Sequence, residues 1–172
     1  HASTRRKGLA RLTRSYWGMQ LAHLGLLVTV LGVAFTSTYS IEKDVRLAPG
    51  ETITVNGYAF RFDGVKDHQG PNYVAQRGTL EVSHDGFVEV LHPEKRIYRV
   101  QQNPMTEAAI SGNAFRDLYV ALGEPLDAGA WAVRIYHKPM IRWVWFGALM
   151  MALGGLLSIL DKRYRLKVAG GR

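Results

Sequence analysis

One histidine lies inside a long apolar run near the start of the chain. His23 is the one ionisable side chain between Tyr16 and Phe35. As a helix, this run of about 20 residues rises about 30 Å, the thickness of the hydrocarbon core of a bilayer. An imidazole in hydrocarbon is unfavourable unless it is hydrogen-bonded, faces a polar cavity or binds a metal. The residues alone leave two interpretations of His23 open: a hydrogen bond that bridges helices, or an axial ligand to haem iron.

The other histidines in the body of the chain form no recognisable set of metal ligands. They are His68, His84, His92 and His137. No two of them follow the short spacings of a metal site, so we expect them to be surface residues. The chain has no cysteine, which excludes disulfides and thiolate metal sites. Phosphate-binding and nucleophile-elbow patterns are also missing from the sequence, which therefore indicates no catalytic residue.

A second apolar run, Ile141 to Leu160, matches the first in length, and both are expected to be transmembrane helices. Ser15 is a candidate N-cap of the first helix. Small residues recur along one face of each helix, a pattern that permits close packing of helices. They are Gly18, Ala22, Gly25, Thr29 and Gly32 in the first helix, and Ala148, Ala152 and Gly155 in the second.

Arg142 stands at the start of the second run, where a long side chain can reach the lipid headgroups. Trp143 and Trp145 follow it and are typical of the aromatic belt at a membrane interface. Two partners are open for Arg142: a lipid phosphate, which we favour, and a carboxylate such as a haem propionate.

Positive charge is concentrated at the two ends of the chain. The net charge of +8 and the pI near 9.9 arise before the first run and after the second, while the stretch between them is slightly acidic. The positive-inside rule explains this distribution better than nucleic-acid binding does. We therefore predict a cytoplasmic basic segment (1–14), a transmembrane helix (15–36), an exported β-rich domain (37–138), a second transmembrane helix (139–160) and a cytoplasmic basic tail (161–172). Membrane lipid is an expected partner of the chain, and nucleic acid is not.

The stretch between the two runs carries the signals of short strands. Asn56-Gly57 and Asp85-Gly86 each separate two extended segments and predict two-residue hairpins. Further strands are expected at 96–100, 118–122 and 131–136, whereas residues 105–110 are expected to form a short helical or irregular insertion. The predicted fold class is integral membrane, with two transmembrane α-helices flanking an exported all-β domain, a small barrel or sandwich.

Several runs of the sequence resemble the C-terminal part of the CcmF family, the haem lyase component of cytochrome c maturation in bacterial inner membranes. In chain order they are Tyr16-Trp-Gly-Met, Leu21-Ala-His-Leu-Gly25, Gly70-Pro-Asn-Tyr73, Leu91-His-Pro-Glu-Lys-Arg-Ile-Tyr98, Met105-Thr-Glu-Ala-Ala-Ile110, Arg116-Asp-Leu-Tyr-Val-Ala-Leu-Gly-Glu124, Gly129-Ala-Trp-Ala-Val-Arg134 and Lys138-Pro-Met-Ile-Arg-Trp143. The similarity extends from about Ser15 to Arg165 and so covers nearly the whole chain. The nitrite-reductase-associated relative of CcmF is the alternative family.

The resemblance implies that His23, in the run Ala-His-Leu-Gly, is one of two transmembrane histidines that ligate a haem b. It also implies three kinds of partner: other cytochrome c maturation subunits, a haem chaperone, and the apocytochrome c to which haem is joined by thioether bonds. The chain would then lie in the bacterial inner membrane, with the middle domain in the periplasm and both ends in the cytoplasm.

The chain also departs from the family pattern. The tryptophan-rich signature, the partner transmembrane histidine and the two exported histidine ligands are missing from the sequence. None of the four histidines of the middle domain matches those ligands. We therefore expect the chain to be the C-terminal third or less of a lyase, and to be inactive in haem ligation by itself.

Two other classes of function stay open at this point. In one, the chain is a structural or scaffold membrane subunit whose periplasmic β-domain binds a partner without haem. In the other, it is a membrane-tethered ligand sensor, which would need a pocket in the β-domain, and the sequence supplies no polar cluster that indicates such a pocket. A haem spectrum that depends on His23 separates the lyase from the scaffold.

Overall fold

The computed structural model describes residues 13–100 and 102–161, which fall into two compact units. Among the described residues, one unit is helical and comprises 13–35 together with 140–161. The other unit, Thr36–Pro139, consists of β-strands. Two membrane-length helices and an all-β unit between them confirm the predicted fold class.

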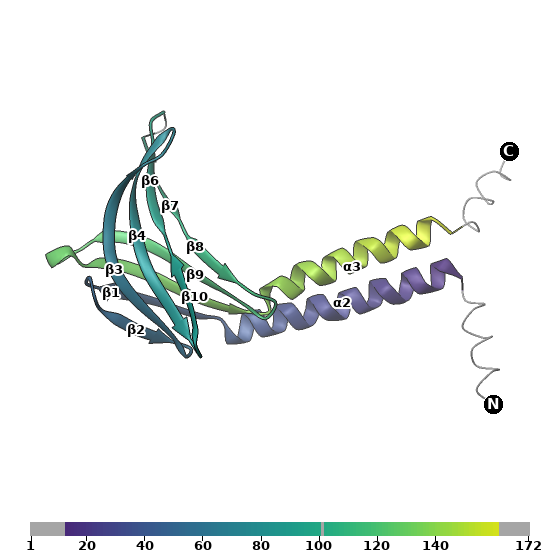
Figure 1. The fold of residues 1–172 in the computed structure, drawn as a ribbon. Coiled ribbons are helices and arrows are strands. Elements are labelled where there is room, and N and C mark those ends of the chain that lie inside the picture. Colours follow the sequence, from purple (N-terminus) through teal and green to yellow (C-terminus); the bar gives the residue numbers. More distant parts are fainter. Residues whose placement is uncertain (1–12, 101, 162–172) are drawn as a thin grey trace. The chain divides into compact units, whose positions relative to one another are not determined.

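The helical unit is an antiparallel pair of helices, α2 (Arg14–Tyr39) and α3 (Ile141–Ile159), as Figure 1 shows. Both are long and apolar enough to cross a membrane. The N-cap prediction for Ser15 is wrong, because α2 begins one residue earlier. Instead, the hydroxyl of Thr13 accepts the backbone N–H of Tyr16 at 3.2 Å, and the N–H of Ser15 donates to the Asp161 carboxylate at 2.9 Å. This carboxylate also complements the positive end of the α2 dipole.

Glycines bring the two helix backbones into contact. A Cβ atom added at Gly18 would lie 2.5 Å from the Gly154 carbonyl oxygen, and one added at Gly25 would lie 2.7 Å from the Gly147 carbonyl oxygen. Farther along α2, a Cβ atom added at Gly32 would lie 2.8 Å from the backbone nitrogen of Val144 in α3. No side chain fits in these places, so the small-residue face predicted for the first helix is confirmed as its packing face.

The small-residue stripe of the second helix, Ala148, Ala152 and Gly155, does not form the contact with α2. Gly147 and Gly154, seven residues apart, make the close contacts with α2, whereas a Cβ atom at Gly155 would meet nothing within 4 Å. A stripe of small residues permits a close approach without choosing between neighbouring faces. Gly147 and Gly154 lie on the face of α3 whose backbone comes nearest to the glycines of α2.

The β unit contains two sheets, which curve around a common core in Figure 1. The four-stranded sheet has the order β1-β10-β9-β8, and the six-stranded sheet has the order β2-β3-β4-β6-β7 with β5 also paired to β4. The strands are β1 (Ile41–Leu47), β2 (Thr52–Val55), β3 (Tyr58–Gln69), β4 (Tyr73–His84), β5 (Phe87–Leu91), β6 (Glu94–Tyr98), β7 (Pro104–Glu107), β8 (Ala109–Gly112), β9 (Arg116–Pro125) and β10 (Trp131–Pro139). A short 3₁₀ turn, η1 (Asp127–Gly129), joins β9 to β10. All strand pairs are antiparallel.

The backbone angles of the two central turn residues determine the type of each predicted hairpin. Asn56 and Gly57 have φ values of 49° and 81°, and Asp85 and Gly86 have φ values of 45° and 80°. Positive φ at both central residues defines the type I′ turn, whose twist matches that of paired strands. Both hairpin predictions are confirmed, as β2–β3 and β4–β5.

The core lies between the inner faces of the two sheets. Its largest fully buried side chains are Phe60, Phe62, Leu80, Leu118, Leu122 and Ile135. A bulge in β3 between Phe62 and Gly64 moves the following residues to the other parity, with Gly64 at a φ of 111°. As a result, Val65 and Asp67 continue the inner face that Phe60 and Phe62 begin.

One element prediction for the β unit is wrong. Residues 105–110 are not an irregular insertion, because they belong to the edge strands β7 and β8. β7 pairs with β6, and β8 pairs with β9 in the other sheet, so the chain changes sheets at Ala108. Residues 41–47, for which no strand is predicted from the sequence, form β1 against β10.

The helix contact yields a first test. We expect Gly25→Leu to destabilise the helix pair by about 1–3 kcal/mol or more, because its side chain would overlap the α3 backbone. Thermal unfolding of the purified protein in detergent, followed by circular dichroism, measures the change. Gly155→Leu is the matched control, since it adds the same side chain in open space. Equal melting temperatures for the two variants would contradict the contact.

Candidate functional site

His23 lies on an exposed face of α2, away from the glycine seam. Its neighbours one turn away, Met19 and Leu27, are exposed apolar side chains, as is Val30 two turns away. No acidic side chain lies in α2. Within α2, the histidine is therefore the ionisable side chain of an otherwise apolar exposed face.

The imidazole of His23 has one nitrogen engaged and one available. Its Nδ1 atom lies 2.8 Å from the carbonyl oxygen of Met19, one turn earlier in the helix. A carbonyl oxygen can only accept, so in the neutral imidazole Nδ1 carries the proton and Nε2 keeps its lone pair. Metal-binding histidines are commonly oriented in this way, because the second hydrogen bond fixes the tautomer and raises the basicity of the ligand.

These features fit one axial ligand of a haem. The available atom is a neutral imidazole nitrogen, the usual protein donor to haem iron. His23 is the one histidine in the two helices, so a second imidazole ligand would have to come from another segment. Among the described residues, no group of three or more histidine or carboxylate side chains could hold a different metal.

Of the four histidines of the β unit, three lie at or near the surface as expected and one is buried. His68 and His84 are half-buried, and His92 is an exposed residue whose Nδ1 lies 3.3 Å from the Gly78 carbonyl oxygen. His137 contradicts the expectation of a surface position, because its residue is only 7% exposed. It lies on the inward-facing side of β10, in line with Val133 and Ile135.

His137 belongs to a polar cluster at one end of the core that the sequence analysis missed. Tyr58 stacks on His84, with ring centres 4.2 Å apart, and its ring centre lies 6.0 Å from that of His137. The Asn56 amide donates to His137 Nε2 at 3.1 Å, which requires a neutral imidazole. Burial, and then the charge of Arg116, lower the pKa of His137. These residues come from four strands and a turn, so no local motif indicates them.

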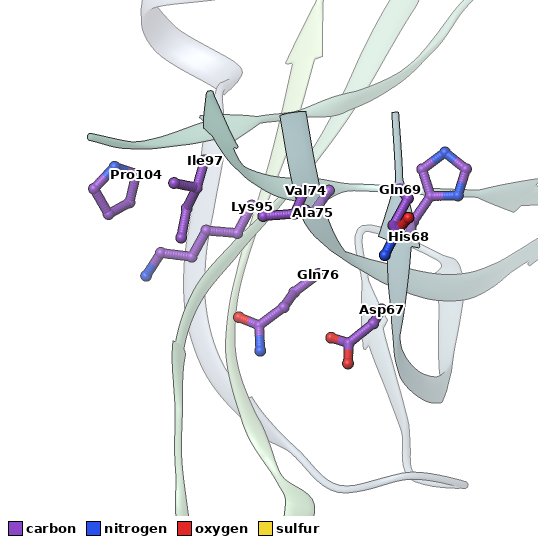
Figure 2. Close-up of a pocket in the computed structure, with 9 residues that line it drawn as sticks. All are labelled: Asp67, His68, Gln69, Val74, Ala75, Gln76, Lys95, Ile97 and Pro104. Carbon is purple, nitrogen blue, oxygen red and sulfur yellow. The ribbon is translucent and has the colours of Figure 1, made fainter. Parts of the chain in front are cut away.

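The inner face of the six-stranded sheet also carries a cavity of about 450 Å³ beyond the core. Figure 2 shows Lys95, Ile97 and Pro104 on one side of it and Asp67 on the other, with Gln76 between them. Lys95 is already paired, because its Nζ atom lies 2.5 Å from a carboxylate oxygen of Glu124. The cavity therefore mixes apolar and charge-compensated polar groups and indicates no particular chemistry.

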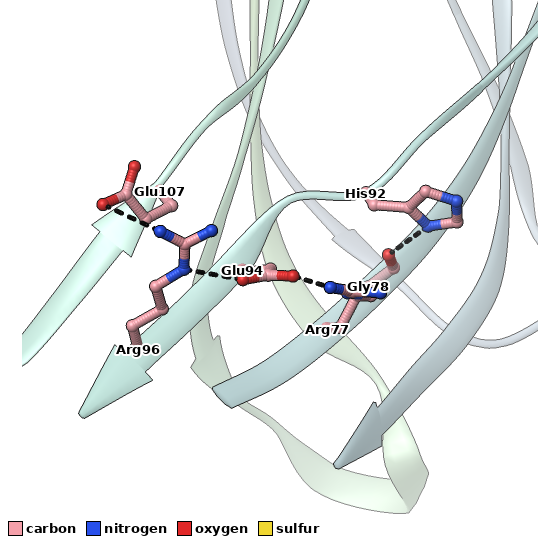
Figure 3. A network of polar contacts seen from close by, with 6 residues as sticks. All are labelled: Arg77, Gly78, His92, Glu94, Arg96 and Glu107. Atoms are coloured by element: carbon pink, nitrogen blue, oxygen red, sulfur yellow. Dashed lines mark hydrogen bonds and ion pairs between the residues drawn. The ribbon is translucent and has the colours of Figure 1, made fainter. Parts of the chain in front are cut away.

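A second polar network in the same sheet is structural. Figure 3 shows the Glu94 carboxylate between the guanidinium groups of Arg77 and Arg96, with Arg96 extending to Glu107. Glu94 is 4% exposed. Its burial by itself would raise its pKa, but the hydrogen bonds from Arg96 and Arg77 outweigh this effect and lower the pKa. Each charge in the network has an opposite charge beside it.

The class of protein is defined by two helices long and apolar enough to cross a membrane, packed through glycines, with an all-β unit between them in the chain. Residues 38–139 match the family described as "CcmF C-terminal beta-sandwich". The chain belongs to the CcmF family. The family inferred from the resemblance is therefore confirmed, while the haem-ligand role that the resemblance implies for His23 stays a prediction.

Individual relatives agree with this assignment. The chain is 58% identical over 170 residues to the cytochrome c-type biogenesis protein CcmF of Pseudomonas aeruginosa, an alignment that covers 96% of this chain and 26% of that protein. Identity to the cytochrome c-type biogenesis protein NrfE of Haemophilus influenzae is 34% over 151 residues, covering 87% of this chain and 24% of that protein. The nitrite-reductase-associated alternative is thus the more distant relative. The chain spans about a quarter of the length of these curated relatives.

A solved structure shares the fold. It is titled "Cytochrome c Heme Lyase CcmF" and superposes with a TM-score of 0.74 at 23% sequence identity, covering 91% of this chain and 27% of that chain. At this identity the likeness concerns the fold alone. The helix pair and the β-sandwich therefore recur together in that structure.

The Glu94 network yields a test of buried charge pairing. We expect Glu94→Gln to lower the free energy of unfolding of the β unit by about 1–3 kcal/mol, because two charge-assisted hydrogen bonds to a buried group are lost. Hydrogen exchange of the β4 and β6 amides measures this change. The matched control is Asp44→Asn, which removes an exposed pair with Arg134 and should have little effect. A larger effect from the exposed pair would contradict the assignment.

His137 yields a pH-dependent stability. Its unfolded pKa is about 6.5 and its folded pKa is lower, so below about pH 6.5 the unfolded chain binds more protons. The contribution of neutral His137 is therefore complete above that pH and is lost as the pH falls through the folded pKa. We expect a slope of up to about 1.4 kcal/mol per pH unit in this window. Hydrogen exchange of the core amides, corrected for intrinsic rates, should show a smaller slope in His137→Gln, and an unchanged slope would contradict this origin.

Proposed function

We propose that this chain is the C-terminal portion of a cytochrome c haem lyase, in which His23 supplies one axial ligand to a haem b within the membrane. The observation that carries the proposal is the single imidazole on an apolar helix face, with Nδ1 hydrogen-bonded to the Met19 carbonyl and Nε2 available. Membership of the CcmF family supports the haem, because a relative of the same fold is titled as a haem lyase.

The residues of this chain hold and orient the haem in this proposal. The glycine seam fixes the rotation of α2, so that His23 points away from α3. The Met19 carbonyl holds the imidazole in one tautomer. The exposed side chains of Met19, Leu27 and Val30 give an apolar surface that excludes water from the porphyrin face. When bound, the haem supplies one-electron redox chemistry, with a potential that depends on both axial ligands and on burial.

The β unit has a binding role in the same proposal. It forms a periplasmic platform where the haem chaperone, the apocytochrome c and other maturation subunits meet. The positive-inside rule supports this topology, because in the sequence one basic segment precedes the first helix and the other follows the second. Most residues of those segments, 1–12 and 162–172, lie outside the described part of the chain. Lipid phosphate as the partner of Arg142 stays a prediction.

The second candidate is a scaffold membrane subunit whose β-domain binds a partner without haem. The cavity of about 450 Å³ on the inner face of the six-stranded sheet favours a binding role of this kind. In that case His23 would only make a polar contact inside the membrane. In either case this chain by itself is expected to be inactive in haem ligation.

The haem ligand is tested in the full-length protein purified in detergent. We expect His23→Ala to lose the low-spin b-type signal in reduced-minus-oxidised spectra and in a pyridine haemochrome assay. His23→Gly should regain that signal when imidazole is added, because the free ligand can enter the space left by the side chain. A packing or hydrogen-bonding role would not give this spectral rescue.

Leu24→Ala is the matched control, since it truncates a neighbouring side chain that is also exposed on the same helix. It should retain the b-type signal at the wild-type level per protein. If His23→Ala is inserted normally and keeps the full low-spin spectrum, His23 is not a ligand and the scaffold function is preferred.

A further inference from the structure

Arg116 is a buried arginine at the same end of the β core as Tyr58 and His137. Its residue is 9% exposed. Its Nε atom donates to the Tyr58 hydroxyl at 3.0 Å, and its Nη1 atom donates to the carbonyl oxygen and the Oγ atom of Ser111 at 2.8 and 3.0 Å. The guanidinium carbon also lies 4.8 Å from the centre of the Tyr58 ring. Three neutral groups and an aromatic ring therefore hold this side chain in one orientation.

No carboxylate lies within ion-pairing distance of Arg116 among the residues that the structure describes. The arginines at 61, 77, 96 and 134 are all more exposed, and each is paired with at least one carboxylate. A buried guanidinium without an opposite charge is unfavourable, because the solvation it loses is not replaced. This arrangement differs sharply from that of the Glu94 network.

One edge of the guanidinium faces a cavity of about 380 Å³ that Arg116 lines. Nη2 makes no hydrogen bond with a described residue, and no inaccessible polar side-chain atom in the described part of the chain lacks a partner. Nη2 is therefore accessible from the cavity. Asn113 lines the cavity too, and its Oδ1 atom accepts two backbone N–H groups, so its amide nitrogen is left to donate. Phe87 provides an apolar wall and is half-exposed.

Glu89 is the negative group in the lining of this cavity. The hydroxyl of Ser111 donates to a Glu89 carboxylate oxygen at 2.5 Å and accepts from Arg116 Nη1, so it connects the two charges. His137 is neutral, and His84 donates from Nδ1 to the Gly57 carbonyl at 2.9 Å, with its other nitrogen 3.3 Å from Asp85. The cavity thus offers one open cationic edge, and the single carboxylate in its lining disfavours a doubly charged ligand.

We propose that this cavity is a binding site for a carboxylate group carried on a short apolar arm. The carboxylate would pair with Arg116 Nη2 and accept a hydrogen bond from the Asn113 amide, while Phe87 covers the methylene groups. Guanidinium groups bind carboxylates with matched geometry and with shorter, stronger hydrogen bonds than neutral donors make. Glu89 selects the singly charged carboxylate over a dianionic phosphate.

Two sources could supply this carboxylate. One is a haem propionate, and this source rests on the proposed function, which brings haem to the protein. The other is an acidic side chain of a protein partner. The site itself, defined by the shared chemistry, is independent of the role of His23.

The test uses full-length protein in detergent and hydrogen exchange of the segment 109–122, with sodium propionate titrated against sodium chloride at constant ionic strength. We expect propionate, and not chloride, to protect this segment in the wild type. Arg116→Gln should raise the half-saturating concentration about tenfold or more, because a charge-assisted bond to a largely buried group is lost. Glu89→Gln should lower it several-fold, because the opposing charge is removed.

Glu89→Gln also decides the question if Arg116→Gln fails to fold. A structural role for the cluster predicts no protection by propionate in the wild type, and either this result or weaker binding in Glu89→Gln overturns the proposal. His23→Ala should keep the propionate effect, so failure of the haem-ligand proposal leaves this result intact. If haem protects the segment and the dimethyl ester of haem does not, a haem propionate is the source of the carboxylate. Equal effects of haem and ester, with propionate still protective, assign the site to a protein carboxylate.

Discussion

The glycine contact between α2 and α3 fixes the orientation of every other group on α2. Inside a membrane the hydrophobic effect does not drive helices together, so their association depends on close van der Waals packing and a few hydrogen bonds. Gly25 and Gly147 allow the backbones to touch, and the Thr29 hydroxyl adds a bond to the Val144 carbonyl at 3.4 Å. A helix held along one seam cannot rotate about its axis, and His23 is therefore presented on a defined outer face. At the end of the pair where α2 begins, the Asp161 carboxylate adds a further hydrogen bond between the two helical segments.

The β unit places charge in two different ways. Around Glu94, two arginines compensate a buried carboxylate, and the network closes on itself (Figure 3). Around Arg116, a buried guanidinium is held by a hydroxyl, a carbonyl and an aromatic ring, and one edge stays open to a cavity. The first arrangement compensates the charge of the buried carboxylate within the sheet itself. The second leaves an interaction to be completed, which is the physical difference between a structural network and a binding site.

Local chemistry made part of the fold predictable. Asn56-Gly57 and Asp85-Gly86 adopt the backbone angles that their residue types favour, so both hairpins could be inferred before any tertiary contact was known. The edge strands at 104–112 could not, because they are four residues long and owe their extended form to pairing with β6 and β9. The choice of Gly147 and Gly154 over Gly155 was likewise invisible, since composition does not say which face of α3 comes nearest to α2.

The sequence by itself determined the two apolar helices, the β character of the unit between them, the family and the isolation of His23 in an apolar run. Each of these depends on neighbours in the chain or on patterns that span it. Only the tertiary structure decided that Nδ1 of His23 is engaged while Nε2 is available, and that His137 is buried. It alone assembled the Arg116 site, because Tyr58 and Arg116 are 58 positions apart and meet only when β3 and β9 face each other across the core. The physical reason is that strand pairing and sheet packing join distant residues, and no local spacing records which ones will meet.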